Sequence, residues 1–168
     1  LDFEDLIGLT VKLFREYPAV LQSYQERFPY VMVDEYQDTN YAQFVWTKLL
    51  AGENGNVFVV GDPDQSIYSW RGAEPYNIER FLDTYPQAKV IKLEKNYRST
   101  RYILEAANAV IHNNTGRMKK ELYTDNPRGE KLLQFGAASH QQEAEFIAQY
   151  IKQLVNEGIY RYQDFAIF

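Results

Sequence analysis

Two short apolar runs, each followed at once by acidic residues, constrain the fold more than any other feature of this sequence. Residues 30–33 lead into Asp34 and Glu35, and residues 57–60 lead into the segment 61–65, which begins Gly-Asp. Continuous apolar runs of this length, bounded by turn residues, are typical of strands buried in a parallel sheet. Because the C-terminal ends of parallel strands meet at one edge, the sequence predicts a site for hydrated Mg²⁺ and a nucleotide phosphate there.

Strand and helix patterns alternate along the rest of the chain. Apolar runs predict three further strands, at 90–93, 132–135 and 165–168. Apolar residues at helical spacing and capping residues predict five helices, which lie at about 3–14, 41–51, 74–84, 101–111 and 140–157. This order predicts an α/β fold with a mainly parallel sheet flanked by helices.

Composition narrows the class of protein. The chain has no cysteine, which excludes disulfides and thiolate metal sites. No apolar stretch has the length of a membrane span, and no signal peptide opens the chain, so a cytoplasmic protein without a membrane partner is expected. Residues 1–88 hold 14 acidic and 6 basic residues, whereas residues 89–168 hold 9 acidic and 12 basic ones. A polyanion should therefore prefer the second half or the seam between the halves.

The acidic residues after the first two runs suggest phosphate chemistry. Asp34 could hold magnesium through water, and Glu35 could orient or deprotonate an attacking water. Two solvated loop acids are the plainer interpretation. Asp38, Asp62 and Asp64 are expected at the same edge, and like charges so placed repel unless a cation or a proton lies among them. The sequence therefore favours a phosphate site.

The segment after the second run combines a polar sensor with aromatic residues. Gln65 is neutral and could hydrogen-bond a terminal phosphate. Tyr68 and Trp70 recur two residues apart and Arg71 follows, a pattern that suits the stacking of single-strand bases. The alternative is that Trp70 belongs to the core.

A further candidate segment precedes the fourth helix. Tyr97 could stack on a purine, and the guanidinium of Arg98 could clamp a phosphate. A surface arginine and a helix cap are the plainer alternative. The basic run at 117–120 could contact a nucleic-acid backbone, but a solvated loop is expected.

Three motifs together resemble one family. Residues 34–40 read DEYQDTN, residues 61–73 read GDPDQSIYSWRGA, and residues 96–100 read NYRST. In order and spacing they resemble motifs of the UvrD/PcrA/Rep-type superfamily-one ATP-dependent DNA helicases. The resemblance implies a RecA-like, P-loop NTPase-type fold spanning parts of two motor lobes. It also implies 3′-to-5′ movement on single-stranded DNA in DNA repair or replication.

The resemblance assigns roles to individual residues. It implies catalytic roles for Glu35, Gln65 and Arg98, the last as an arginine finger, and assigns Mg²⁺ to Asp34. Contacts to ATP would come from Asp34, Glu35, Gln65, Tyr97 and Arg98. Contacts to DNA would come from Tyr68, Trp70 and Arg71, with Arg71 also helping to link the two sites.

The resemblance also implies boundaries and missing parts. Residues 1–28 would be the helical tail of an inserted subdomain, 29–94 the C-terminal part of the first lobe, and 95–168 the N-terminal part of the second. None of the nine glycines is followed by lysine, so the phosphate-binding loop G-x-x-x-x-G-K-[ST] is absent from this chain. We expect the remaining N- and C-terminal parts of the motor to lie outside the chain, which alone should be inactive.

Two other classes of function compete with a motor segment. A non-catalytic nucleotide- or DNA-binding module is one, and a phosphate-binding loop upstream in a longer reading frame would argue against it. A metal-dependent nuclease with Asp34, Glu35, Asp62 and Asp64 around two metal ions is the other. Cleavage of DNA with magnesium and without ATP would favour the nuclease.

Overall fold

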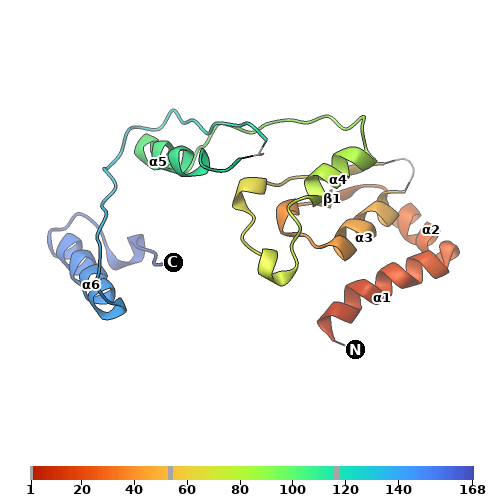
Figure 1. The fold of residues 1–168 in the computed structure, drawn as a ribbon, viewed down its shortest axis with the longest axis horizontal. Helices are drawn as coiled ribbons and strands as arrows, with labels where there is room; N and C mark the ends of the chain where they lie inside the picture. Colours follow the sequence, from red (N-terminus) through yellow and green to blue (C-terminus); the bar gives the residue numbers. More distant parts are fainter. Residues whose placement is uncertain (1, 53–54, 116–117) are drawn as a thin grey trace. The chain divides into compact units, whose positions relative to one another are not determined.

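The computed structural model describes residues 2–52, 55–115 and 118–168, which form two compact units, Leu1–Asn126 and Pro127–Phe168 (Figure 1). The helices and strands of the described residues are α1 (Phe3–Glu16), α2 (Pro18–Arg27), β1 (Val31–Val33), α3 (Tyr41–Ala51), β2 (Val57–Val59), α4 (Asn77–Thr84), α5 (Arg101–Ile111) and α6 (His140–Asn156). Short 3-10 turns lie at Tyr36–Asp38, Pro63–Gln65, Ser69–Arg71 and Tyr162–Asp164. Within these ranges, no helix combines the length and the apolar character that crossing a membrane requires.

The first two apolar runs form a parallel pair of strands, as predicted. Val31–Val33 of β1 lies in register with Val57–Val59 of β2. The pairing continues past both strands, because the Val60 amide donates to the Val33 carbonyl and the Tyr36 amide donates to the Val60 carbonyl, each at 2.9 Å. The two strand ends, and the acidic residues that follow them, are thereby brought together.

The three further strands that the sequence predicts do not form. Residues 90–93, 132–135 and 165–168 have no regular strand pairing, and outside β1 and β2 the described chain has one isolated bridge, between Lys95 and Tyr123. An apolar run supplies side chains for a sheet, but a strand also needs a neighbour for its backbone N–H and C=O groups. The prediction of strands at 90–93, 132–135 and 165–168 was therefore wrong for this chain, and the sheet of the described residues has two strands.

All five predicted helices form, and side-chain caps begin α1, α3 and α6 but not α4 or α5. The Asp2 carboxylate accepts from the Asp5 amide at 3.0 Å and Asp5 returns the bond, and Asn40 and Gln43 make the same reciprocal pair before α3. The helix predicted at 74–84 begins instead at Asn77. Before this helix, the Glu74 amide donates to the carbonyl of Thr39 at 2.9 Å.

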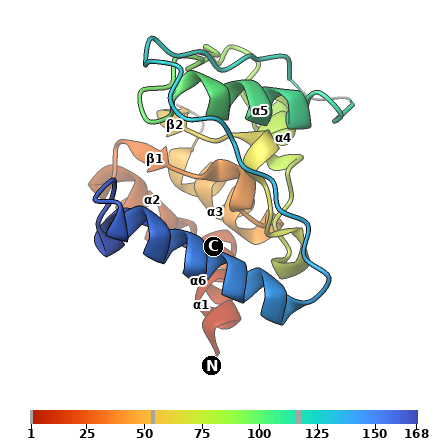
Figure 2. The same cartoon turned by 90° about the vertical axis from the view of Figure 1, so that its left-hand side faces the viewer.

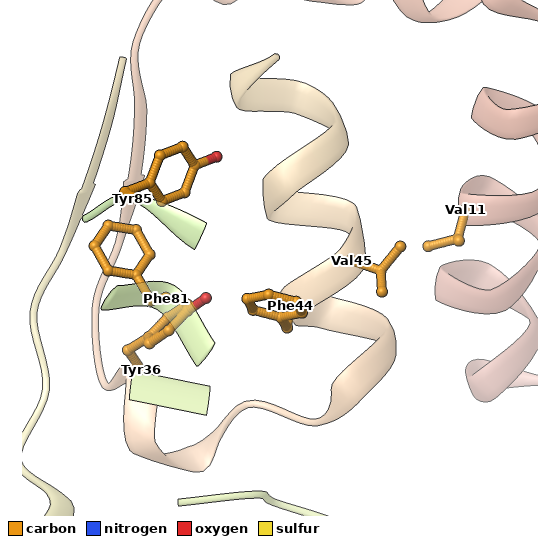
Figure 3. Close-up of a cluster of buried hydrophobic side chains, with 6 residues drawn as sticks. All are labelled: Val11, Tyr36, Phe44, Val45, Phe81 and Tyr85. Carbon is orange, nitrogen blue, oxygen red and sulfur yellow. The ribbon is translucent and has the colours of Figure 1, made fainter. Parts of the chain in front are cut away.

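The core of the first unit joins the strand ends to the helices. Rings of Tyr36, Phe81 and Tyr85 lie between α3 and α4, while Val45 of α3 points toward Val11 of α1 (Figure 3). The Tyr36 and Phe81 rings meet edge to face, with centroids 5.9 Å apart. Since Tyr36 belongs to the segment just after β1, burial of its ring fixes the backbone of that segment against α4.

The second unit is built on α6, the long helix labelled in Figure 2. Ser139 caps it by accepting from the Gln142 amide at 3.2 Å. The rings of Phe135, Phe146 and Tyr150 stack in sequence, with centroids 3.9 Å and 5.8 Å apart. This stack attaches the chain before the helix to the face of α6 that carries Phe146 and Tyr150.

Candidate functional site

Gln37 joins the ends of the two strands. Its side chain is 1% exposed, and its Oε1 accepts from the Asp62 amide at 2.9 Å. On the other side, its Nε2 donates to Glu35 Oε2 at 2.9 Å and more weakly to Asp38 at 3.4 Å. One buried amide therefore sets the position of Glu35 relative to the segment that begins at Asp62.

A glycine makes this close approach feasible. A Cβ atom on Gly61 would lie 2.9 Å from Gln37 Oε1 and 3.2 Å from the backbone nitrogens of Tyr36 and Gln37. Real Cβ contacts are longer, and the buried Gln37 amide has no room to move aside. Residue 61 must therefore be a glycine for the two segments to lie this close.

Gly61→Ala should lower the free energy of unfolding by about 1–3 kcal/mol, because the added methyl group overpacks the junction of the strands. Urea unfolding of this chain measures the change. Gly8→Ala is the matched control, since nothing lies within 4 Å of its added Cβ. As Gly8 is in α1, its replacement should be neutral or stabilising. Equal stability of Gly61→Ala and the parent chain would contradict the argument.

Asp34 and Glu35 are exposed at the end of β1. The Glu35 amide donates to Asp34 Oδ1 at 2.9 Å. Glu35 has a φ of +48°, and it is the single non-glycine residue with positive φ in the described chain. Such a conformation costs about 1–2 kcal/mol and is concentrated at functional sites. Exposed hard oxygens of this kind fit Mg²⁺, which prefers one or two carboxylates with water and phosphate as the other ligands.

The acids after β2 are arranged differently from the sequence prediction. The Lys120 ammonium contacts Asp62 Oδ1 and lies 3.3 Å from Asp64 Oδ2, with the lysine side chain 19% exposed. Burial alone would raise the pKa of Asp62, but hydrogen bonds from Lys120 and Gln65 outweigh it and hold that pKa below its usual value. Lys120 thus supplies the positive charge that balances the neighbouring carboxylates of Asp62 and Asp64. The expectation that Lys120 belongs to a solvated loop was wrong; Arg117, in the same run, lies outside the described residues.

The carboxylates do not form the two-metal cluster that a nuclease would need. Across residues 2–52, 55–115 and 118–168, no three acidic or histidine side chains gather closely enough to hold a metal ion. Asp62 and Asp64 instead contact Lys120.

Tyr68, Trp70 and Arg71 form an exposed cluster, which we call the aromatic cluster. Trp70 is 73% exposed, so its indole is not part of the core. The Arg71 guanidinium carbon lies 4.5 Å from the Trp70 ring centroid and 5.1 Å from that of Tyr68. Exposed rings beside a guanidinium can stack bases and bind the adjoining phosphates.

The segment of Tyr97 and Arg98 has its backbone fixed and its side chains exposed. Asn96 Oδ1 accepts from the amides of Arg98 at 2.9 Å and Ser99 at 2.7 Å. Asn126 donates to the carbonyls of Tyr97 and Ser99. Tyr97 is 79% exposed, and the Lys95 ammonium lies 5.4 Å from its ring centroid. The tight turn therefore presents both side chains to solvent, as a nucleotide contact requires.

The structure brings some of the predicted site residues together and leaves others apart. Gln65 Nε2 donates to Asp62 Oδ2 at 2.9 Å, and Gln37 links Asp62 to Glu35, so Gln65 and Glu35 belong to one hydrogen-bonded network. Among the described residues, no hydrogen bond or ion pair joins the side chain of Arg98 to this network.

Asn77 is a positioning residue that the sequence patterns did not reveal. It is fully buried, and its Nδ2 donates to Thr39 O at 2.9 Å and to Thr39 Oγ1 at 3.2 Å. Its Oδ1 accepts from Arg80, which pairs with Glu74. The end of the segment 34–40 is thus tied to the start of α4. The role of Gln37 was missed likewise, because Asp62, which it joins to Glu35, lies 25 positions away in the sequence.

Comparison with known proteins covers the whole chain. The UvrD/REP helicase N-terminal domain matches residues 1–86, and the UvrD-like helicase C-terminal domain matches residues 91–168. The chain is 52% identical over 167 residues to the ATP-dependent DNA helicase PcrA of Staphylococcus aureus, 50% identical over 166 residues to that of Leuconostoc citreum, and 49% identical over 157 residues to DNA helicase II of Escherichia coli.

These matches take up 99%, 99% and 94% of this chain but only 23%, 22% and 22% of the relatives, so the chain spans less than a quarter of their length. The motifs around β1, β2 and the turn before α5 lie inside the two matched domains. On this evidence, the chain belongs to the UvrD/Rep family of helicases.

Proposed function

We propose that this chain is the central part of an ATP-dependent DNA helicase, which couples ATP hydrolysis to 3′-to-5′ movement along single-stranded DNA in DNA repair or replication. The observation that carries the proposal is the network through Gln37. It connects Glu35 to Asp62 and Gln65, and the same short segment continues into the aromatic cluster. A nucleotide contact and a DNA contact thus share one stretch of backbone.

The roles proposed for the residues follow from their chemistry. Asp34 would hold Mg²⁺, which neutralises phosphate charge when it is bound. Glu35 would orient and deprotonate the attacking water, and Gln65 would hydrogen-bond the terminal phosphate. Tyr97 would stack on adenine, while Arg98 would stabilise the charge that develops on the transferred phosphoryl group.

The architecture proposed for this motor has two RecA-like lobes. In this interpretation, residues 1–28 come from an inserted subdomain, 29–94 from the first lobe and 95–168 from the second. The parallel pairing of β1 and β2, with α3 packed against them, agrees with the edge of such a sheet. The family matches, at 1–86 and 91–168, divide the chain close to the proposed lobe boundary.

A chimera tests the proposed function. This chain replaces the matching 167 residues of the Staphylococcus aureus helicase, and ATP hydrolysis is measured with and without single-stranded DNA. We expect hydrolysis that single-stranded DNA stimulates, and translocation from 3′ to 5′ on a strand with a labelled end. A folded chimera whose hydrolysis does not respond to DNA would refute the proposal.

This chain alone should not hydrolyse ATP measurably, even with Mg²⁺ and single-stranded DNA. The physical reason is that its sequence contains no loop of the G-x-x-x-x-G-K-[ST] type to surround the phosphates. Release of phosphate by the purified chain measures this. Turnover that Glu35→Gln abolishes would show that the chain builds a phosphate site of its own.

Trp70→Ala in the chimera should raise the Kd for single-stranded DNA by about 5–150-fold for any base sequence, because stacking contributes about 1–3 kcal/mol per base. Fluorescence anisotropy with several oligonucleotides measures this. Tyr76→Ala is the matched control, since Tyr76 is 67% exposed and lies outside the aromatic cluster. Unchanged affinity together with a lower melting temperature would instead assign Trp70 a structural role.

A further inference from the structure

Lys120 lies far along the chain from the acids that it contacts. Its ammonium group reaches Asp62, 58 residues earlier, and approaches Asp64 Oδ2 at 3.3 Å. The side chains of Lys120, Asp62 and Asp64 are each less than a quarter exposed. Their ionic contacts are therefore shielded from solvent, unlike those of an ordinary surface ion pair. The contact therefore fixes all three side chains.

The Asp62 carboxylate contacts both Lys120 and Gln65. One carboxylate oxygen, Oδ1, meets Lys120 and accepts from the Asp64 amide at 3.0 Å. The other, Oδ2, accepts from Gln65 Nε2 at 2.9 Å. Gln65 is otherwise exposed, and among the described residues this bond is the hydrogen bond that holds its amide group. The orientation of Gln65 thus depends on a carboxylate that Lys120 holds.

The segment that carries Lys120 is bonded to the elements on either side of Arg98. Directly after Lys120, Glu121 donates its amide to Glu94 Oε1 at 3.1 Å, and Leu122 exchanges hydrogen bonds with the side chain of Asn108. Tyr123 then pairs with the backbone around Lys95, immediately before the turn of residues 96–100. The backbone of Lys120 is therefore anchored to the elements that hold Arg98.

We propose that Lys120 is a positioning residue: through Asp62 it orients the Gln65 amide, and it thereby ties the segment that carries Arg98 to the residue that reads the terminal phosphate. The role assigned to Gln65 rests on the proposed function. The link itself, from Lys120 through Asp62 to Gln65, rests on the contacts above. If residues 94–126 move relative to β1 and β2, Lys120 moves with them, and the orientation of the Gln65 amide changes through Asp62.

The first test removes the ammonium group in the chimera. Lys120→Met should lower kcat for DNA-stimulated ATP hydrolysis by up to about 10²-fold, with little change in KM, because a misplaced catalytic group loses rate rather than substrate affinity. Lys120→Arg should restore most of the rate, since a guanidinium can meet both carboxylates. Lys119→Met is the matched control, because the Lys119 side chain is exposed.

A double-mutant cycle separates positioning from plain stabilisation. In a Gln65→Ala background, Lys120→Met should cause no further loss of kcat, since its effect passes through Gln65. Equal losses in both backgrounds, or a lower melting temperature with unchanged kcat, would overturn the proposal.

The second test needs neither ATP nor DNA. In the ¹⁵N–¹H spectrum of this chain, the side-chain amide signals of Gln65 should shift in Lys120→Met and Asp62→Asn but not in Lys119→Met. If they do not shift, the link is absent and the proposal fails. If they shift while the parent chimera hydrolyses no ATP, the link stands and the proposed function is what fails.

Discussion

Arg98→Ala in the chimera is expected to lower DNA-stimulated ATP hydrolysis by about 10³–10⁵-fold, the range over which an arginine finger acts in phosphoryl transfer. The guanidinium would face the phosphoryl oxygens on which negative charge accumulates in the transition state. An alanine side chain has no positive charge and no hydrogen-bond donor to stabilise that charge. The side chains of Asn96 and Asn126 hold the turn that presents Arg98 through hydrogen bonds to the turn's backbone, which the substitution leaves in place. Steady-state kinetics and thermal unfolding measure the two effects separately.

Two further variants sharpen the result for Arg98. Arg98→Lys keeps the charge but loses the planar fork, and it should recover only a small part of the rate. Arg101→Ala removes another exposed arginine from the first turn of α5 and should leave the rate nearly unchanged. If Arg98→Ala and Arg101→Ala behave alike, Arg98 is an ordinary surface residue.

Glu35→Gln should reduce the same hydrolysis by about 10²–10⁴-fold, which is what a positioned general base contributes. Glutamine has the same shape and its Oε1 can still accept from Gln37 Nε2, so the network at the strand ends is preserved. The melting temperature and the Kd for ATP should therefore change little while kcat falls. Single-turnover hydrolysis measured at saturating ATP reports the chemical step directly.

Glu79→Gln supplies the control for Glu35, because it neutralises an exposed carboxylate in α4 away from the strand ends. Its rate should match that of the parent chimera. A Glu35→Gln chimera that retains full kcat would exclude Glu35 as the base, whereas a fall in both melting temperature and kcat would indicate damage to the network of Gln37.

The sequence predicts the local parts of this fold well. The caps before α1 and α3 use residues three positions apart, Asp2 with Asp5 and Asn40 with Gln43, so each depends only on neighbours in the sequence. The runs that became β1 and β2 pair with each other, so their side-chain pattern and their backbone partner are both within the chain. The run at 90–93 has the same pattern but no regular strand beside it, and its prediction as a strand was wrong.

The sequence did not predict the contacts between residues that lie far apart along the chain, and these contacts determine how the site is held together. Gln37 meets Asp62 across 25 positions, Asn77 meets Thr39 across 38, and Lys120 meets Asp62 across 58. No periodicity records such pairs, because each depends on how complete elements pack. The motifs indicate which residues would carry out the chemistry, and these contacts determine how those residues are held. The roles of Glu35 and Arg98 stay predictions.

The guanidinium of Arg71 lies over the rings that are proposed to receive DNA bases. A base that stacks on the same ring faces would displace it, and binding would then be an exchange instead of a simple addition. A cation on an exposed ring gains about 0.5–1 kcal/mol, against about 1–3 kcal/mol for a stacked base, so the exchange favours the base by a small margin. Under the proposed function, the displaced guanidinium would bind a neighbouring phosphate. Capture and release of each nucleotide would then be close in free energy, so that a stacked base would not be held too tightly to leave.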